Sequence, residues 1–205
     1  MQQNKPLPNW LIISLFSLWI TATLFGLWWF QQANLKSFIG AKDDNRFYQA
    51  MAIEDILAPY INDLPEALTN QQTLLHFWKP DCLCNRLSQR HFRQLLAEFT
   101  AEELRIIIIA HPMSSREEID NLQQLNGERL TIIRAENDLL PLPSSPSLAL
   151  INNDNKLGYF GPYGFGAFCT SSEDGFLTSL VNRMASDEPL TTFTNVIGEG
   201  CFCSW

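Results

Sequence analysis

The sequence predicts an α/β domain, with a central mixed sheet flanked by helices, behind one N-terminal transmembrane helix. Residues 10–30 form an uncharged apolar run, WLIISLFSLWITATLFGLWWF. At about 1.5 Å per residue, a helix of this length spans a hydrocarbon core of about 30 Å. Farther along, apolar runs at 73–78 and 104–110 flank a segment with helical spacing. This is the pattern of a βαβ unit, whose two strands are parallel and joined by a right-handed crossover.

The apolar run is predicted to anchor the chain in a membrane. It exceeds an ordinary signal-peptide core, and the QQA that follows Phe30 is a poor cleavage site. Trp10 at one end and Trp28 with Trp29 at the other occupy interfacial positions. The count of positive charges slightly favours a cytoplasmic domain. We nevertheless expect a single-pass protein of the inner (cytoplasmic) membrane whose C-terminal domain is periplasmic or extracytoplasmic, because its cysteine pattern suits an oxidising compartment.

Charge and length limit the remaining alternatives. A formal net charge of -8, without any run of basic residues, excludes a nucleic-acid-binding protein. The length allows one anchor and one domain. The expected parts are a short tail (1–9), the transmembrane helix (10–30), a juxtamembrane linker and helix (31–62), the main domain (63–185) and a C-terminal tail (186–205).

Helix and strand signals give the element order of the domain. A juxtamembrane helix is expected over 46–58, capped by Asp43, Asp44 or Asn45 and stopped by Pro59. A capping box from Ser115 to Glu118 begins another helix, and Ser172 is expected to cap the last one. The expected strands are 73–78, 104–110, 130–134, 147–151 and 157–160, and the other expected helices are 85–99, 115–126 and a closing helix up to about residue 184.

Three local motifs carry a resemblance to a known family. HFWKPDC (76–82) is similar to the DFWAxWC that begins the active-site helix of the thioredoxin superfamily, and SPSLALI (145–151) is similar to its cis-proline and following strand. A hairpin and a terminal helix complete the resemblance, which spans about 73–184. It implies that Cys82 is the exposed nucleophile of a thiol-disulfide oxidoreductase acting on protein thiols or disulfides. It also implies that Pro146 is the cis-proline that abuts the cysteines and aligns a substrate strand.

The cysteine pair departs from the family pattern. The family's second cysteine position holds Asn85, and Cys84 falls between the two family positions. A helix N-terminus stabilises a thiolate, so Cys82 is expected to attack and Cys84 to act as its resolving partner. A Cys82–Cys84 disulfide would close a small strained ring, which favours an oxidant or disulfide-shuffling role.

His76 occupies the place of the family's buried acid in the HFW motif. An imidazole titrates near neutral pH, so His76 is a candidate general base for the cysteine pair. The alternative is a core histidine that is hydrogen-bonded within the sheet.

Three further cysteines are candidate secondary redox residues. Cys169 lies in a glycine-rich loop, and Cys201 with Cys203 forms a second Cys-x-Cys in the terminal GCFCSW. The tail is aperiodic and long enough to cross the domain, which suggests an arm that exchanges disulfides with the first pair. Alternatively, its two cysteines join each other, or they form a hydrophobic plug with Phe202 and Trp205.

Two other function classes remain open, a copper chaperone and a redox-inactive binding module. The main prediction and the binding-module alternative include no cofactor. Soft sulfur ligands suit Cu(I), and the thioredoxin fold also hosts the Sco copper chaperones. In that alternative Cys82 and Cys84 bind copper with His111, because His91 lies about 10 Å along the helix from Cys84. The other alternative is a redox-inactive binding module, which follows if Cys84 cannot reach Cys82.

Overall fold

The computed structural model of the chain describes residues 8–40, 45–62, 68, 71–136, 142–166, 175–186 and 192–205. The chain divides into two compact units, Met1–Leu35 and Lys36–Trp205. The first contains α1 (Asn9–Asn34), the one helix in the described part of the chain that is long and apolar enough to cross a membrane. None of the candidate span is buried inside the protein. The predicted N-terminal helix is therefore confirmed as a helix.

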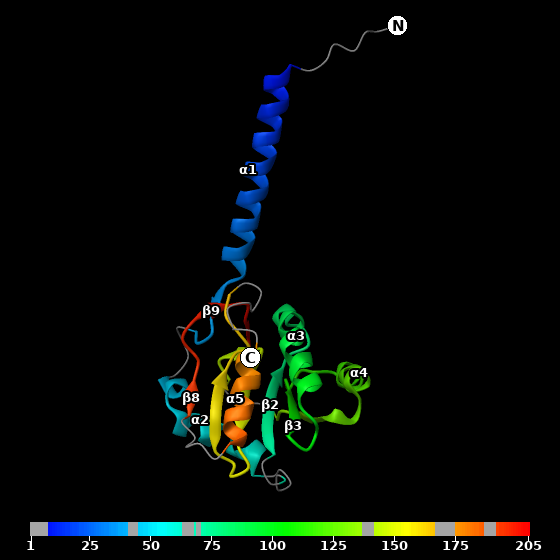
Figure 1. The fold of residues 1–205 in the computed structure, drawn as a ribbon, viewed down its shortest axis with the longest axis vertical. Coiled ribbons are helices and arrows are strands. Elements are labelled where there is room, and N and C mark those ends of the chain that lie inside the picture. The colour runs from blue at the N-terminus through cyan, green and yellow to red at the C-terminus, as the bar shows by residue number, and fades with distance from the viewer. Residues whose placement is uncertain are drawn as a thin grey trace. The chain divides into compact units, whose positions relative to one another are not determined.

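A six-stranded mixed sheet forms the centre of the second unit (Figure 1). Its strand order is β4-β3-β2-β6-β7-β8, in which β2, β3 and β4 are parallel and β6 is antiparallel to both of its neighbours. This confirms the predicted mixed sheet and βαβ unit. The strands are β2 (Gln72–Trp78), β3 (Leu104–Ala110), β4 (Leu130–Arg134), β6 (Ser147–Ile151), β7 (Leu157–Gly161) and β8 (Phe193–Thr194).

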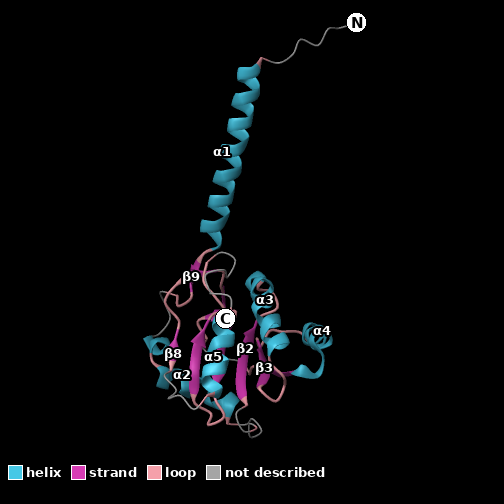
Figure 2. Ribbon diagram, viewed as in Figure 1, coloured by secondary structure: helices cyan, strands magenta, loops and turns pink. Residues whose placement is uncertain are grey.

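Helices cover both faces of this sheet (Figure 2). The connections β2-α3-β3 and β3-α4-β4 move the same way across the sheet, so right-handed crossovers require α3 and α4 on one face. Residues of α3, α4 and α5 share one buried cluster with Leu74 and Ile106, whereas α2 packs on Leu75 and Phe77. Burial on both faces explains the continuous apolar strands. The helices are α2 (Ala50–Ile61), α3 (Leu83–Glu98), α4 (Arg116–Asn126) and α5 (Phe176–Ala185).

The juxtamembrane helix differs from its predicted bounds. A 3-10 turn occupies Asn45–Tyr48, and α2 then runs through Pro59, which was expected to stop it. Near the end of a helix a proline removes one backbone hydrogen bond, and burial of Leu57 and Ile61 beside it favours the continued helix. Asp43, Asp44 and Ser172 lie outside the described residues. The capping box at Ser115 is confirmed.

The end of the chain is part of the fold, in contrast to the loosely ordered tail that its aperiodic sequence suggested. β9 (Glu199–Gly200) pairs with β1 (Lys36–Ser37), and β10 (Cys203–Ser204) pairs with β5 (Ser144–Ser145). Phe202 between them is buried against Phe38. A side chain at Gly200 would place its Cβ 2.8 Å from the Phe202 ring, so this close approach requires glycine. Two-residue strands have no periodicity that a sequence can reveal.

Candidate active site

The first Cys-x-Cys lies where β2 leads into α3, as predicted. Cys82 is the N-cap residue of α3, with an extended backbone (φ -86°, ψ 111°), and Cys84 lies in the first helical turn. The first turn of a helix leaves backbone N–H groups without intrahelical partners and carries the positive end of the helix dipole. A thiolate released at this position is therefore stabilised electrostatically.

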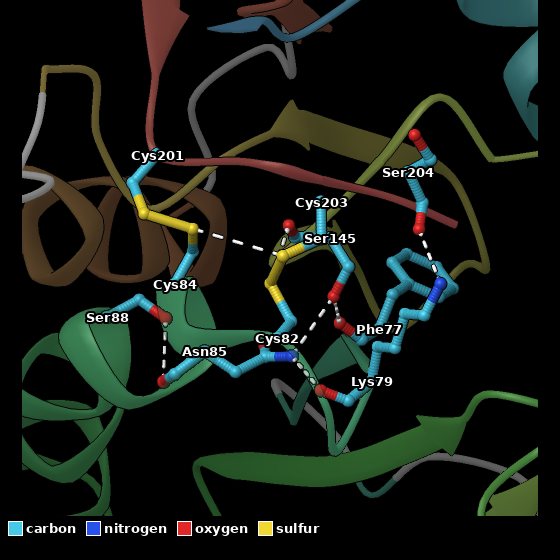
Figure 3. Close-up of a disulfide and its surroundings, with 10 residues drawn as sticks. All are labelled: Phe77, Lys79, Cys82, Cys84, Asn85, Ser88, Ser145, Cys201, Cys203 and Ser204. Carbon is cyan, nitrogen blue, oxygen red and sulfur yellow. Dashed lines mark hydrogen bonds between the residues drawn. A yellow bond between two sulfur atoms is a disulfide. The ribbon is translucent and has the colours of Figure 1, made fainter. Parts of the chain in front are cut away.

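Each of these cysteines is bonded to the C-terminal segment (Figure 3). Cys82 pairs with Cys203 at an S–S distance of 2.10 Å, and Cys84 pairs with Cys201 at 2.09 Å. The expectation that Cys82 and Cys84 pair with each other is wrong for this state of the protein. Alternate residues of an extended chain face the same side, so Cys201 and Cys203 can both meet the start of α3. The sequence suggested a disulfide link between the C-terminal tail and the Cys82–Cys84 segment, and such links are present.

The tail covers the residue that was expected to be exposed. Cys82 is only 1% exposed, and Cys84 and Cys201 are 5% exposed, so the prediction of an exposed nucleophile is wrong. Cys203 is the least buried of the four described cysteines. The cysteine residue of this centre that is most exposed to solvent therefore belongs to the C-terminal segment.

The Ser145–Pro146 peptide bond is cis, which confirms the prediction of a cis-proline at position 146. The carbonyl oxygen of Ser145 lies 3.5 Å from the Cys82 sulfur. In β10, Cys203 pairs with Ser145 and Ser204 pairs with Ser144. The end of the chain thus pairs with β5, the residues before Pro146, where the family resemblance predicts a substrate strand.

Asn85 ties the cysteine loop to the cis-proline loop. Its side-chain N–H groups donate to the carbonyl oxygen of Lys79 at 2.6 Å and to the Ser145 hydroxyl at 3.2 Å. The Ser145 hydroxyl in turn donates to the carbonyl oxygen of Phe77 at 3.3 Å. In the sequence Asn85 is evident only as a departure from the family pattern, and no sequence signal reveals this bridging role.

Lys79 and Trp205 hold the last residues in place. The Lys79 ammonium donates to the carbonyl oxygen of Ser204 at 2.8 Å. The Trp205 ring packs edge-on against Phe77 and His111, with ring centroids 6.1 Å and 5.1 Å away. These contacts hold the residues after Cys203 against the domain, and no signal in the sequence reveals either contact.

His76 is a buried part of the core. Its ring stacks on Phe92, and its Nδ1 hydrogen-bonds the Tyr163 hydroxyl at 2.9 Å. Complete burial lowers the pKa of His76 to about 3, so the expectation that it titrates near neutrality is wrong. With Trp78 and Asn85 it lines a cavity of about 480 Å³ between α3 and α4, and no described cysteine lines this cavity. These contacts fit the structural alternative.

The ligands available for copper also differ from the predicted set of Cys82, Cys84 and His111. The sulfurs of Cys82, Cys84 and Cys203 lie within 4.8 Å of one another, and His111 does not belong to this group. His111 instead packs against Trp205. Burial is the larger cause and the nearby Lys79 charge the smaller cause that lower the pKa of His111. His91 is buried in α3. Cys169 lies outside the described residues.

The domain has a thioredoxin-like fold, and its site is a centre of two Cys-x-Cys segments joined by two disulfides. Among solved structures, the chain is similar to a hypothetical protein from Sinorhizobium meliloti 1021 at 12% identity and a TM-score of 0.54, covering 72% of this chain and 82% of that one. Residues 54–205 match the model of the domain of unknown function DUF6436, so the chain belongs to that family.

Two other solved structures are similar over a smaller part of this chain. A secreted disulfide oxidoreductase from Mycobacterium tuberculosis, homologous to E. coli DsbE, is 15% identical, with a TM-score of 0.41 and coverage of 57% and 84% of the two chains. StoA from Bacillus subtilis is 14% identical, with a TM-score of 0.41 and coverage of 55% and 83%. No curated protein matches the chain.

Proposed function

We propose that this chain is a membrane-anchored thiol-disulfide exchange protein that oxidises protein dithiols outside the cytoplasm. One observation carries the proposal: the Cys82–Cys203 disulfide lies between the N-terminus of α3 and the cis-Pro146 loop. This disulfide joins the most exposed cysteine of the centre, Cys203, to a sulfur whose thiolate the helix stabilises. The reaction of this state is therefore the oxidation of a client dithiol.

The electron pair moves in two steps. A client thiolate attacks the Cys203 sulfur, the Cys82–Cys203 bond breaks, and Cys82 leaves as a thiolate at the N-terminus of α3. The second client thiolate then attacks the client sulfur of the mixed disulfide, which completes the client disulfide and releases Cys203 as a thiolate. The two protons of the client thiols remain for Cys82 and Cys203.

Reoxidation uses a protein disulfide as the oxidant and begins at Cys82. The freed Cys82 thiolate attacks one sulfur of the incoming disulfide while β10 no longer covers β5, and the other sulfur of that disulfide leaves as a thiolate. The Cys203 thiolate then attacks the Cys82 sulfur, which re-forms the Cys82–Cys203 bond and releases the second oxidant sulfur as a thiolate. During the first attack, the backbone groups of Ser144 and Ser145, which pair with β10 in the oxidised form, pair with the incoming strand. This is the substrate-aligning role proposed for Pro146.

A single-cysteine client peptide tests which sulfur is attacked. Incubation with the full-length protein in detergent, followed by acid quenching and peptide mapping, should give an adduct on Cys203 and a free Cys82 thiol. Cys203→Ser should reduce adduct formation about tenfold or more, since the remaining disulfide is buried. Cys201→Ser, the matched control, should retain the Cys203 adduct. Wild-type adduct levels on Cys203→Ser would refute the proposal.

The anchor and the location rest on α1 and on the disulfides. α1 presents an uncharged span whose side chains are exposed to their surroundings, as a helix facing lipid would be. Disulfides persist in oxidising compartments. Alkaline phosphatase fused after Trp205 should therefore be active in bacterial cells, whereas β-galactosidase at the same point should be inactive. The opposite pair of results would place the domain in the cytoplasm.

Copper binding by the reduced form is a second candidate function. It is favoured by the three clustered sulfurs of Cys82, Cys84 and Cys203, which as thiolates form a soft ligand set suited to Cu(I). Anaerobic titration of the reduced chain should then give about one Cu(I) per chain, and Cys203→Ser should weaken binding more than His111→Ala. The binding-module alternative follows if Cys84 cannot reach Cys82. It is less favoured because the two sulfurs lie within 4.8 Å of each other and Cys82 is bonded to Cys203.

A further inference from the structure

The two disulfides of the site touch each other. The Cys84 sulfur of one lies 4.0 Å from the Cys203 sulfur of the other, without a bond between them (Figure 3). The Cys82 sulfur lies within 4.8 Å of both. A thiolate formed at Cys203 therefore has a second disulfide within reach of a small side-chain rotation.

We infer that the four cysteines form an internal relay, in which the disulfide held between Cys84 and Cys201 moves to Cys203 after Cys82–Cys203 has been reduced. The relay rests on the proposed function for that first reduction. Its consequence is that one chain oxidises two client dithiols in succession through the same sulfur, that of Cys203.

The relay step conserves atoms and electrons without an external oxidant. The Cys203 thiolate attacks the Cys84 sulfur, a Cys84–Cys203 bond forms, the Cys84–Cys201 bond breaks, and the electron pair remains on Cys201 as a thiolate. The chain contains one disulfide before the step and one after it. A second client dithiol then attacks Cys203, and Cys84 leaves as a thiolate in the first turn of α3.

Burial and tethering favour this internal route over direct reduction of Cys84–Cys201. Both of those residues are only 5% exposed, which hinders external thiols. Phe202, 2% exposed, holds the segment between Cys201 and Cys203 in the core. A tethered thiol acts at an effective concentration of about millimolar or above, so Cys203 outcompetes micromolar external dithiols.

Full-length Cys82→Ser isolates the relay step, because it leaves the Cys203 thiol beside the Cys84–Cys201 disulfide. The protein is incubated without any client, quenched in acid, alkylated and digested with chymotrypsin, which separates Cys201 from Cys203 at Phe202. Crosslinked Cys84–Cys203 peptides are expected in about a tenth of the chains or more. Cys84→Ser is the matched control: it keeps the Cys82–Cys203 disulfide and should show Cys201 alkylated.

A second measurement avoids any loss of structure in the variants. Wild-type protein treated with one equivalent of dithiothreitol should also give the Cys84–Cys203 peptide. Its absence from both Cys82→Ser and partly reduced wild type would overturn the relay. Since neither experiment contains a client, that failure is distinguishable from failure of the proposed function, which the client adduct on Cys203 tests.

Discussion

The two Cys-x-Cys segments share their spacing but not their backbone. The first begins a helix, with Cys82 in an extended N-cap conformation and Cys84 already helical. The second is extended near its end: Cys201 and Cys203 face α3, whereas Phe202 between them is buried against Phe38. Equal spacing therefore does not determine which cysteines pair, because the backbone sets the direction of each sulfur.

The segments also differ in what holds them. Cys82 is positioned by the β2-α3 connection and by the Asn85 bridge to Ser145. The second segment depends on two disulfides, one buried ring and two-residue strands. Removing these disulfides and contacts in separate variants should show which of the two segments depends on the other for its position.

Removing both disulfides should have the largest effect on stability. The bonds span 121 and 117 residues, and one bond of this span contributes about 5 kcal/mol in the loop-entropy model. Cys201→Ser/Cys203→Ser should thus lower the free energy of unfolding by about 5 kcal/mol or more, whereas either single change should cost only about 2 kcal/mol, because the remaining bond still closes the long loop. Urea unfolding without reductant measures both. Equal costs for the single and double variants would show that the two bonds do not act as a redundant pair.

Phe202→Ala tests whether the buried ring holds the second segment. Its loss from the core should destabilise the protein by about 3–5 kcal/mol with both disulfides intact. Ile197, 80% exposed in the same segment, provides the control, and Ile197→Ala should change stability by less than about 0.5 kcal/mol. Similar values for the two variants, measured by urea unfolding, would mean that the disulfides alone hold the segment.

Burial of His76 beneath α3 should make the stability of the domain depend on pH. The pKa of His76 is about 3 in the folded protein, below its unfolded value of about 6.5, so the unfolded state binds the proton first as pH falls. Stability should fall by about 2 kcal/mol between pH 7.5 and pH 5. His76→Gln, which retains a polar partner for Tyr163, should remove this part of the slope. An unchanged slope in His76→Gln would assign it to other groups.

Lys79→Met should have the smallest effect on stability and a selective effect on reactivity. The lost hydrogen bond to the Ser204 carbonyl is exposed and should cost about 0.5–1 kcal/mol. Release of the chain end should accelerate attack of a small thiol on Cys82–Cys203 by about two- to fivefold. Lys156→Met, in the turn between β6 and β7, should leave the rate unchanged. Mass shifts after timed alkylation measure the rate. Identical rates in the two variants would show that the Lys79 hydrogen bond does not restrict access to the Cys82–Cys203 disulfide.

Local features were predictable because local residues cause them. The apolar run 104–110 coincides with β3, and the Ser115 capping box begins α4 where the sequence placed it. Pro146 was recognised as the cis-proline from its motif, and the start of α3 followed from the strand that precedes it. By contrast, the continuation of α2 through Pro59 depended on burial against the sheet, which the residues around Pro59 do not reveal.

The sequence by itself determined the apolar N-terminal helix, the order of strands and helices in the mixed sheet, and the placement of Cys82 at a helix start. Only the tertiary structure decided which cysteines pair, since the four described cysteines alone allow three pairings and the bonded residues lie 117 and 121 positions apart. It also decided that Cys82 is covered and that His76 stays neutral. Disulfide pairing, exposure and pKa depend on distances and solvent access that exist only after distant segments have packed together.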